Sequence, residues 1–352
     1  MNPSAPDSGG QEGGLPFVTA IMPVRNEADW LEHSLGAVLG QDYPTDRFEL
    51  LVADGDSDDG SRKMLDEYAR KDPRVKIIAN PERIVATGLN RAIRAARGSV
   101  IARVDAHTVL ANDYIRCGVD ALERTGADNV GGPMVTSGGG PIGEAVSRAM
   151  GSRLGIGASF HFADNEHESD TTYMGMWPRV VFERVGLFDE ELVRNQDDEL
   201  NYRIRAAGGR VIVSPLLRSR YQNRQSWSAL LRQFFDYGVW KVRVLQKHPR
   251  QMSLRHFIPP GFDLFLVAAI AASPFCPGLG RLAVAALLGY FLVMGAVSIA
   301  GAGGVAGRLR LFAAFAAIHH AWAMGFVFGF LRFAPRWLRA EPGPPVLGGG
   351  GS

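Results

Sequence analysis

The sequence predicts an α/β domain with a mostly parallel sheet and helices on both faces, followed by helices that enter a membrane. The first observation is an alternation of short apolar runs and amphipathic segments between residues 17 and 104. Such alternation builds βαβ units, in which helices cover parallel strands. The second observation is a region at 262–331 that is rich in Ala, Leu, Val, Phe and Gly and nearly free of acids.

Four apolar runs in the first region are predicted to be buried strands, with amphipathic helices between them. The predicted strands are 17–22, 48–53, 75–79 and 99–104, with a later strand at 211–213. The predicted helices are 27–39, a segment that Ser57 and Asp58 cap and that runs to residue 69, and 86–97, which Gly98 closes. Ligands of such sheets bind beyond the carboxyl ends of the strands. Asp54 and Asp105 stand at two of those ends, so we expect a site there.

Composition divides the chain into a main domain and flanking regions. Residues 1–15 are predicted to be a disordered tail without a recognisable signal peptide, and residues 340–352 form a second tail that ends in GGGGS, a typical flexible linker. The main domain is predicted at 16–226, an amphipathic interfacial helix with a linker at 227–260, and a membrane region at 261–339. Residues 155–172 are polar and irregular, which predicts a mobile loop able to act as a lid.

The segment 227–248 has aromatic residues at helical spacing beside Arg232, Lys241, Arg243 and Lys247. This pattern suits an amphipathic helix on a membrane surface. A helix packed on the main domain would show a similar spacing. The pattern therefore leaves both placements open.

Two apolar segments, 282–306 and 311–331, are long enough to span a bilayer, which needs about 20 apolar residues. A third, 262–276, is short and interrupted by Pro274, so it could be re-entrant or interfacial. The preference of cations for the cytoplasmic side favours two spans over three. The cations concerned are Arg308 and Arg310 between the spans and Arg332, Arg336 and Arg339 after them. We expect two to three membrane segments in a bacterial-type inner membrane, with the main domain facing the cytoplasm.

Charge and cysteine content exclude several function classes. A net charge of +2 gives no support for nucleic-acid binding. The basic residues gather near the apolar segments, which suits contact with membrane lipids. Cys117 and Cys276 stand far apart, form no metal motif and indicate no disulfide framework. Nothing in the sequence indicates an oligomeric state.

Acidic residues at two predicted strand ends are candidates for nucleotide and metal binding. Asp54, in VADGDSDDG, could accept hydrogen bonds from a base or a ribose, or it could belong to a solvated capping loop. Asp105 and His107 flank Ala106 after the fourth strand. Two ligands at this spacing can meet one divalent cation and its diphosphate, and a nitrogen ligand favours manganese over magnesium.

Two later clusters carry further charge. The sequence Gln196-Asp197-Asp198-Glu199-Leu200 opens a predicted helix. Its acids could complement the helix dipole, or one of them could remove a proton from a hydroxyl group. Arg218, Arg220 and Arg224 follow the strand at 211–213 and could bind either diphosphate oxygens or anionic lipids, with Arg224 the best phosphate candidate.

Together these segments resemble glycosyltransferase family 2, whose inverting members have the Rossmann-like GT-A fold. The motifs that carry the resemblance are TAIMPVRNE, VADGDSDDG, NPERIVATGLNRAIRAARG leading into VIARVDAH, VFERVGLFDEEL and QDDELNYRI. The combination of DAH, NQDDE and RQFFDYGVWK is similar to the membrane-anchored succinoglycan-biosynthesis (ExoA-like) type. The similarity covers about residues 17–248, and the apolar tail is also similar.

The resemblance implies a role for individual residues. It implies donor binding by Pro23, Arg25, Glu27, Asp54, Asn90, Arg91 and Asp105, metal binding by Asp105 and His107, an acceptor side near Gly175 and Asp198, and a catalytic base at Asp197. Gln196 replaces the Glu that the family usually has in the base motif. YQNRQSW lacks the Gln-x-x-Arg-Trp spacing of processive synthases, which argues against a polymerising enzyme.

These implications predict a metal-dependent inverting glycosyltransferase. A sugar, by default glucose from a UDP-sugar, would pass to a hydroxyl group of a lipid-linked or polysaccharide acceptor with the help of Mn²⁺ or Mg²⁺. A non-enzymatic membrane scaffold or transporter with a degenerate nucleotide-binding domain is the alternative, but it leaves Asp54, Asp105 and Asp197 without a joint purpose. A nicotinamide oxidoreductase would need Gly-x-Gly-x-x-Gly where this chain has PVRNE.

Overall fold

The computed structural model describes residues 14–155 and 164–337, so most of both predicted tails and the middle of the predicted lid lie outside the described residues. Its centre is an eight-stranded sheet in the order β3-β2-β1-β4-β9-β6-β10-β8. The strands are β1 (Val18–Val24), β2 (Phe48–Asp54), β3 (Val75–Ala79), β4 (Val100–Arg103), β6 (Asn129–Gly132), β8 (His167–Glu168), β9 (Tyr173–Pro178) and β10 (Val211–Val213). Strands β3, β2, β1 and β4 run parallel, and β9 enters antiparallel between β4 and β6.

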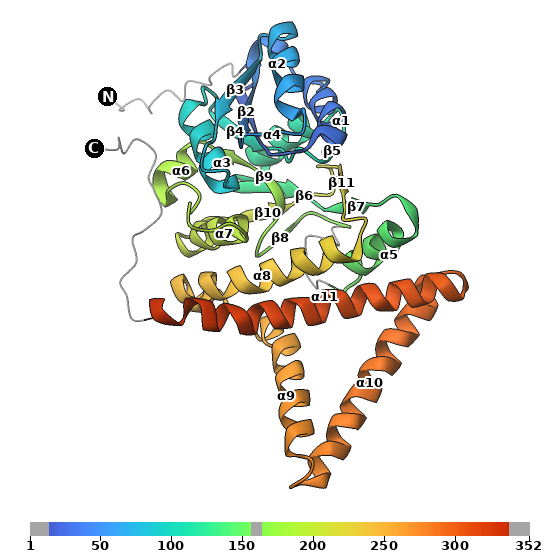
Figure 1. Ribbon diagram of the computed structural model, residues 1–352. Coiled ribbons are helices and arrows are strands. Elements are labelled where there is room, and N and C mark those ends of the chain that lie inside the picture. Colours follow the sequence, from blue (N-terminus) through green and yellow to red (C-terminus); the bar gives the residue numbers. More distant parts are fainter. Residues whose placement is uncertain (1–13, 156–163, 338–352) are drawn as a thin grey trace, which may run out of the picture.

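Helices cover both faces of this sheet (Figure 1). Successive side chains of a strand point to opposite faces, so Ala20 and Met22 of β1 pack in one core while Ile21 packs in the other. The first core includes side chains of α1 (Ala28–Leu39), α2 (Ser61–Lys71) and α4 (Tyr114–Thr125), and the second those of α3 (Val85–Ala95), α6 (Val180–Val185) and α7 (Gln196–Ala206). The predicted α/β class with helices on both faces is confirmed.

Two predicted local details differ from the structure. Helix α2 begins at Ser61, whose backbone amide donates to Asp59 Oδ1, so the predicted cap by Ser57 and Asp58 is wrong. Ser57 and Asp58 instead accept hydrogen bonds from Asn26 in the turn after β1. In the predicted lid, His167–Glu168 forms strand β8, which pairs with β10 and extends the sheet.

A second, three-stranded sheet joins the main sheet to the helical base. Its order is β5-β11-β7, with β5 (Thr108–Leu110), β11 (Ser219–Gln222) and β7 (Val135–Ser137), followed in the chain by α5 (Gly140–Met150). Strand β5 begins one residue after His107, and β11 ends two residues before Arg224. The small sheet therefore ties the end of β4 to the segment that carries Arg224.

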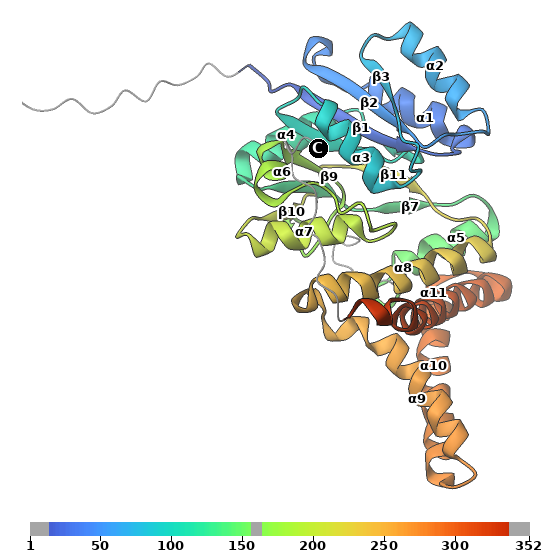
Figure 2. The same cartoon turned by 60° about the vertical axis from the view of Figure 1, so that its left-hand side comes forward.

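Helix α8 (Trp227–Lys247) lies between the α/β domain and α11 (Gly304–Phe333), as Figures 1 and 2 both show. Lys241 and Arg243 of α8 face the domain, because Lys241 pairs with Asp198 and the buried Arg243 pairs with Glu191 at 2.7 Å, whereas Arg232 is exposed. This corrects the placement of these cations on a membrane surface and favours the packed alternative. The two cations on α8 dock the helix against acids that follow α6.

The opposite side of α8 packs closely against α11 because glycines remove side chains from the contact. A Cβ atom on Gly238 would lie 2.3 Å from the carbonyl oxygen of Trp322, and one on Gly325 would lie 2.0 Å from that of Phe235. No real Cβ contact is that short, so any larger residue would force the helices apart. Glycine thus sets the spacing that keeps α11 under the domain.

The remaining helices form a hairpin that projects away from the α/β domain. Helices α9 (Ile258–Ala272) and α10 (Pro277–Gly301) meet at a turn near Phe275, and both views show them below α11. By length and composition α10 and the segment Gly304–Arg336 qualify as membrane spans, whereas α9 is shorter. The predicted span 282–306 is interrupted, because α10 ends at Gly301 and α11 turns along the base of the domain.

Candidate active site

One cavity of about 1210 Å³ opens at the carboxyl ends of β1 and β4 and extends to the helical base. Its upper wall contains Pro23, Arg25 and Glu27 from the β1–α1 turn, as predicted for the nucleotide pocket. Asp105 and His107 line the same cavity, and so do Asp197 and Asp198 at the start of α7. The fold thus brings the predicted metal pair and the predicted base, about ninety residues apart in the chain, to a single space.

His107 has a geometry that suits metal binding. Its Nδ1 atom lies 3.1 Å from Glu27 Oε1, and its ring meets Tyr221 edge-on with centroids 5.1 Å apart. Metal-ligating histidines commonly use one ring nitrogen on a carboxylate, which fixes the ring and leaves the other nitrogen for the metal. Glu27, predicted as a donor-binding residue, is therefore also the carboxylate that orients His107.

Asp105 has one carboxylate oxygen engaged within the protein. Arg103 Nε donates to Asp105 Oδ1 at 2.9 Å, whereas Oδ2 has no partner among the described residues. No group of three His, Cys, Asp or Glu side chains able to hold a metal ion occurs in the described parts of the chain. A cation at Asp105 and His107 would thus need further ligands from outside the protein, and oxygens of a bound diphosphate can supply them. The donor set fits that arrangement.

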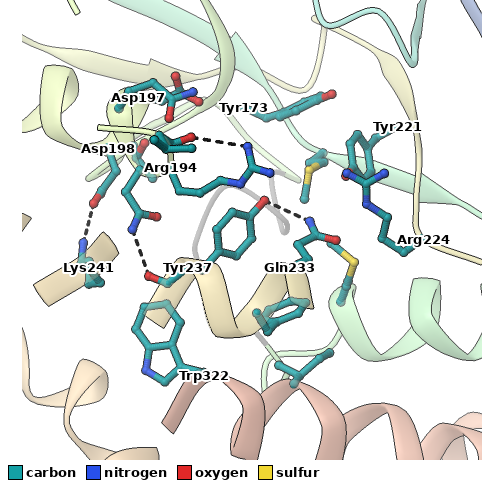
Figure 3. A pocket seen from close by; sticks show the side chains of 18 of the residues that line it. Tyr173, Arg194, Asp197, Asp198, Tyr221, Arg224, Gln233, Tyr237, Lys241 and Trp322 are labelled. Atoms are coloured by element: carbon teal, nitrogen blue, oxygen red, sulfur yellow. Dashed lines mark hydrogen bonds and ion pairs between the residues drawn. The ribbon is translucent and has the colours of Figure 1, made fainter. Parts of the chain in front are cut away.

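The three acids that open α7 have different surroundings. Glu199 is buried and bonded to Arg203 at 2.7 Å and to His248 at 2.8 Å. Its role is therefore structural, because it connects α7 to the end of α8. Asp198 is paired with Lys241 of α8 (Figure 3). Asp197 contacts Arg103, and its second carboxylate oxygen has no partner within the described residues. Asp197 and Asp198 both line the cavity, and Asp197 is the one that shares Arg103 with Asp105.

Arg103 links the two predicted functions. This guanidinium is 6% exposed, and it pairs both with Asp105 and with Asp197. Because an uncompensated charge at this depth is costly, the two carboxylates and the arginine stabilise one another. Arg103 stands at the end of β4, two residues before Asp105, and its position in an apolar strand was the signal that sequence analysis missed.

Burial raises the pKa of Asp197 above the ordinary value of an aspartate, and the positive charge of Arg103 opposes the rise. The possible interaction of these acids with the helix dipole does not take this desolvation into account. A carboxylate with a raised pKa is a stronger base than one in water. The environment of Asp197 thus makes it a stronger base than an ordinary aspartate.

Tyrosines of β9 and β11 and arginines of two loops complete the wall. Tyr173 of β9 bonds to Thr108 at 2.5 Å, and its ring packs edge-on against Tyr221 of β11. Figure 3 shows Arg194 and Arg224 on either side of these rings. Arg224 lines the cavity as predicted, and Arg194 adds a second guanidinium that sequence analysis did not consider. Such planar cations suit phosphate oxygens.

Four predicted site residues do not line the cavity, and each has another contact. Asp54 is buried and contacts the amide of Ser57 and the side chain of Arg62, although its neighbour Gly55 reaches the cavity wall. Asn90 is buried and donates to the carbonyl of Phe188 at 2.8 Å, which ties α3 to the segment before α7.

The other two corrections concern Arg91 and Gly175. Arg91 pairs at the surface with Glu82 at 2.6 Å and does not line the cavity. Gly175 has a φ of 149°, and a Cβ there would lie 2.3 Å from the ring of Trp177. This glycine is needed for packing in β9, and Tyr173, two residues earlier, lines the cavity.

Comparison with known sequences identifies the family. The sequence model of glycosyl transferase family 2 matches residues 19–185. The chain is 31% identical over 326 residues to the succinoglycan biosynthesis protein ExoA of Rhizobium meliloti, a match that spans 90% of this chain and 96% of that protein. It is 26% identical, over 72% of its length and 81% of the relative, to a dolichyl N-acetyl-α-D-glucosaminyl phosphate 3-β-D-2,3-diacetamido-2,3-dideoxy-β-D-glucuronosyltransferase of Methanococcus voltae.

Comparison with solved structures agrees on the fold. The mannosyltransferase PcManGT of Pyrobaculum calidifontis, solved with GDP-Man and Mn²⁺, superposes with a TM-score of 0.58 at 21% identity. The match covers 90% of this chain and 88% of that one. The shared fold includes the GT-A arrangement of sheet and helices.

Proposed function

This chain belongs to glycosyltransferase family 2 and is a glycosyltransferase, and from that premise we propose an inverting, metal-dependent transfer from a nucleotide-diphosphate sugar, by default UDP-glucose, to a hydroxyl group of a lipid-linked or polysaccharide acceptor. The observation that carries the proposal is the meeting of Asp105, His107 and Asp197 in one cavity. Family membership sets aside a non-enzymatic scaffold or transporter.

We assign the steps of the proposed reaction to these side chains. The acceptor hydroxyl gives its proton to Asp197 while its oxygen attacks the anomeric carbon from the face opposite the nucleotide. The bond from that carbon to the diphosphate oxygen breaks, and the nucleoside diphosphate leaves. Arg224 and Arg194 are placed to bind phosphate oxygens. Arg103 keeps Asp197 at a fixed distance from the Asp105 side of the site.

Asp105 and His107 would hold the divalent cation, with Glu27 fixing the His107 ring. A bound cation there would offset the negative charge that develops on the departing diphosphate. The structure of PcManGT was solved with Mn²⁺, which supports a divalent cation for this chain as well. The name of the Methanococcus voltae relative includes a dolichyl phosphate-linked sugar, which supports a lipid-linked acceptor for this chain.

A donor screen tests the function. Purified enzyme with Mn²⁺ should release nucleotide from one member of a panel of nucleotide sugars much faster than from the rest, because the cavity wall selects the base and the sugar together. A UDP-sugar is the expected best donor. A matched preparation of Asp197→Asn controls for contaminating hydrolases. Release from no donor, with and without acceptor lipid, would contradict the proposed function.

We also propose that the α9–α10 hairpin crosses the membrane twice while α11 lies along its cytoplasmic surface. Apolar side chains such as Val267, Leu288 and Leu292 are more than half exposed, and no protein element among those described covers them. From residue 282 to 301, α10 is about 30 Å long, the thickness of a hydrocarbon core. Arg281 would then be the far-side cation, while Arg308 and Arg310 stay with the catalytic domain, as the positive-inside tendency requires.

The native cysteine at the hairpin tip tests this topology. In spheroplasts of a Gram-negative host, a membrane-impermeant maleimide should label Cys276 of a Cys117→Ser variant from the outside, because the tip emerges at the far headgroups. A Cys117→Ser, Cys276→Ser variant with Gly303→Cys between α10 and α11 should react only after permeabilisation. Failure to label Cys276 from outside would show that the hairpin is re-entrant.

A further inference from the structure

The active-site cavity continues well beyond the metal pair and the base. Its lower wall is built by side chains of the membrane helices, among them Phe262 of α9, Met294 of α10 and Ile318 of α11. Ligand pockets usually measure roughly 300–1,000 Å³, so a cavity of about 1210 Å³ has room for more than the donor. The part of the cavity beyond the donor site extends towards α9, α10 and α11.

Four polar side chains gather in this lower part: Asp263, Tyr290, His319 and His320. His320 Nδ1 lies 2.9 Å from Asp263 Oδ1, which joins α11 to α9. His319 Nδ1 lies 3.1 Å from the hydroxyl of Tyr290 on α10, and its Nε2 lies 2.7 Å from the carbonyl of Leu154 after α5. The two histidines therefore connect both arms of the hairpin with the catalytic domain.

His320 keeps one ring nitrogen for another partner. In the described residues nothing accepts from or donates to its Nε2, although 37% of the side chain is exposed. Asp263 fixes the ring through Nδ1 in the way that a carboxylate orients a ligand-binding histidine. Nothing in the transfer step described above uses this group.

The surroundings indicate what the free nitrogen meets. Ionisable groups in apolar helices are costly, and those that face an interior cavity usually serve a ligand. Cationic side chains outnumber carboxylates along the cavity wall, and Arg153 lines it next to Leu154. A diphosphate donor accounts for the cations near Asp105. At the membrane end, Arg153 and the free ring nitrogen of His320 suit a second anion.

We propose that His320, oriented by Asp263 and flanked by Tyr290 and His319, binds the phosphate that links the acceptor to its lipid. The assignment deepens the proposed function and rests on it. The acceptor's lipid would leave the cavity past Phe262 and Met294, and its sugar would extend upwards to Asp197. The polar cluster thus marks the level at which the acceptor's phosphate passes from bilayer to active site.

The test compares two acceptors that differ in the phosphate. One is a lipid phosphate-linked sugar in nanodiscs, and the other is the same sugar as an alkyl glycoside. His320→Ala should raise KM for the phosphate-bearing acceptor about ten-fold, the loss expected for a hydrogen bond to a charged group. KM for the donor and for the glycoside should stay unchanged. Equal changes for both acceptors, or none, would overturn the proposal.

Further arms separate binding from folding. Met324→Ala, on an exposed position of α11, should behave as wild type. If His320→Ala has lost nucleotide binding, Asp263→Asn decides, because it keeps a hydrogen bond to the ring but weakens its charge; it should also raise only the phosphate-bearing KM. Inorganic phosphate at acceptor concentration should not compete, and full competition would contradict a lipid-linked ligand. Transfer by wild-type enzyme to the glycoside tests the proposed function separately.

Discussion

Asp197→Asn is expected to lower turnover by about 10²–10⁴-fold, the usual cost of losing a general base, while donor affinity changes only a few-fold. Asparagine keeps the size of the side chain and can accept a hydrogen bond from Arg103, but it cannot take the acceptor's proton. Nucleotide release measures turnover and calorimetry measures donor affinity. Near-normal turnover would remove Asp197 from the mechanism.

Asp198→Asn is the matched control, one residue along the same helix. Its carboxylate is paired with Lys241, so the substitution should weaken the docking of α8 rather than the chemistry. We expect a lower melting temperature and a much smaller loss of turnover. Collapse of turnover in Asp198→Asn with normal turnover in Asp197→Asn would move the base by one residue.

The pH profile gives an independent check on Asp197. Burial raises the pKa of this carboxyl, so the active, ionised form is lost as pH falls through a value above the ordinary 3.8 of an aspartate. The acidic limb of kcat/KM should lie correspondingly high. Asp197→Asn should flatten that limb, since the remaining slow reaction no longer needs an ionised base at this position.

The strands were predictable because their sequences are short apolar runs, although β3, at the edge of the sheet, is not the buried strand predicted and buries only Val75. Residues 75–79 and 211–213 appear with the predicted bounds, and β1, β2 and β4 differ by one or two residues at their ends. Parallel strands buried on both sides leave few other assignments for such runs. The strand ends then located Asp105 correctly, since a ligand site lies where the strands end.

Side-chain direction was less predictable. Asn90 and Gly175 belong to motifs that predicted site residues. In the structure, Asn90 is hydrogen-bonded to Phe188, and Gly175 leaves room for the ring of Trp177. The Asn90 contact leaves no local pattern, because it joins segments that are distant in the chain. Arg103 was missed because one of its two acidic partners, Asp197, comes from a distant helix.

Hydropathy alone could not place the membrane helices. It detected α10 and α11 as candidate spans, but glycines at 238 and 325 let α11 pack along α8, and hydropathy does not record that contact. The predicted domain boundary at residue 226 also separates α8 from the domain against which it packs through Lys241 and Arg243. His319 and His320 were visible as a polar pair in an apolar segment, and only the structure supplies their partners.

Removal of divalent cations is the second change with a large expected effect. Excess chelator should abolish transfer, and Mn²⁺ should restore it at least as well as Mg²⁺, because His107 offers nitrogen where oxygen ligands are more usual. Full activity in excess chelator would contradict the metal assignment. The experiment also needs a direct measurement of binding, because loss of activity alone does not identify the ligands.

Electron paramagnetic resonance of Mn²⁺, with nucleoside diphosphate present, supplies that measurement. His107→Ala should remove most of the binding, since one of two protein ligands is lost. Glu27→Ala should weaken Mn²⁺ affinity by roughly 10–100-fold, as for other carboxylates that orient a ligating histidine, because Glu27 Oε1 lies 3.1 Å from His107 Nδ1. Glu32→Ala, an exposed position on the same helix, should bind Mn²⁺ as wild type. Wild-type affinity in Glu27→Ala would limit Glu27 to the nucleotide pocket, and wild-type affinity in His107→Ala would leave Asp105 as the sole protein ligand.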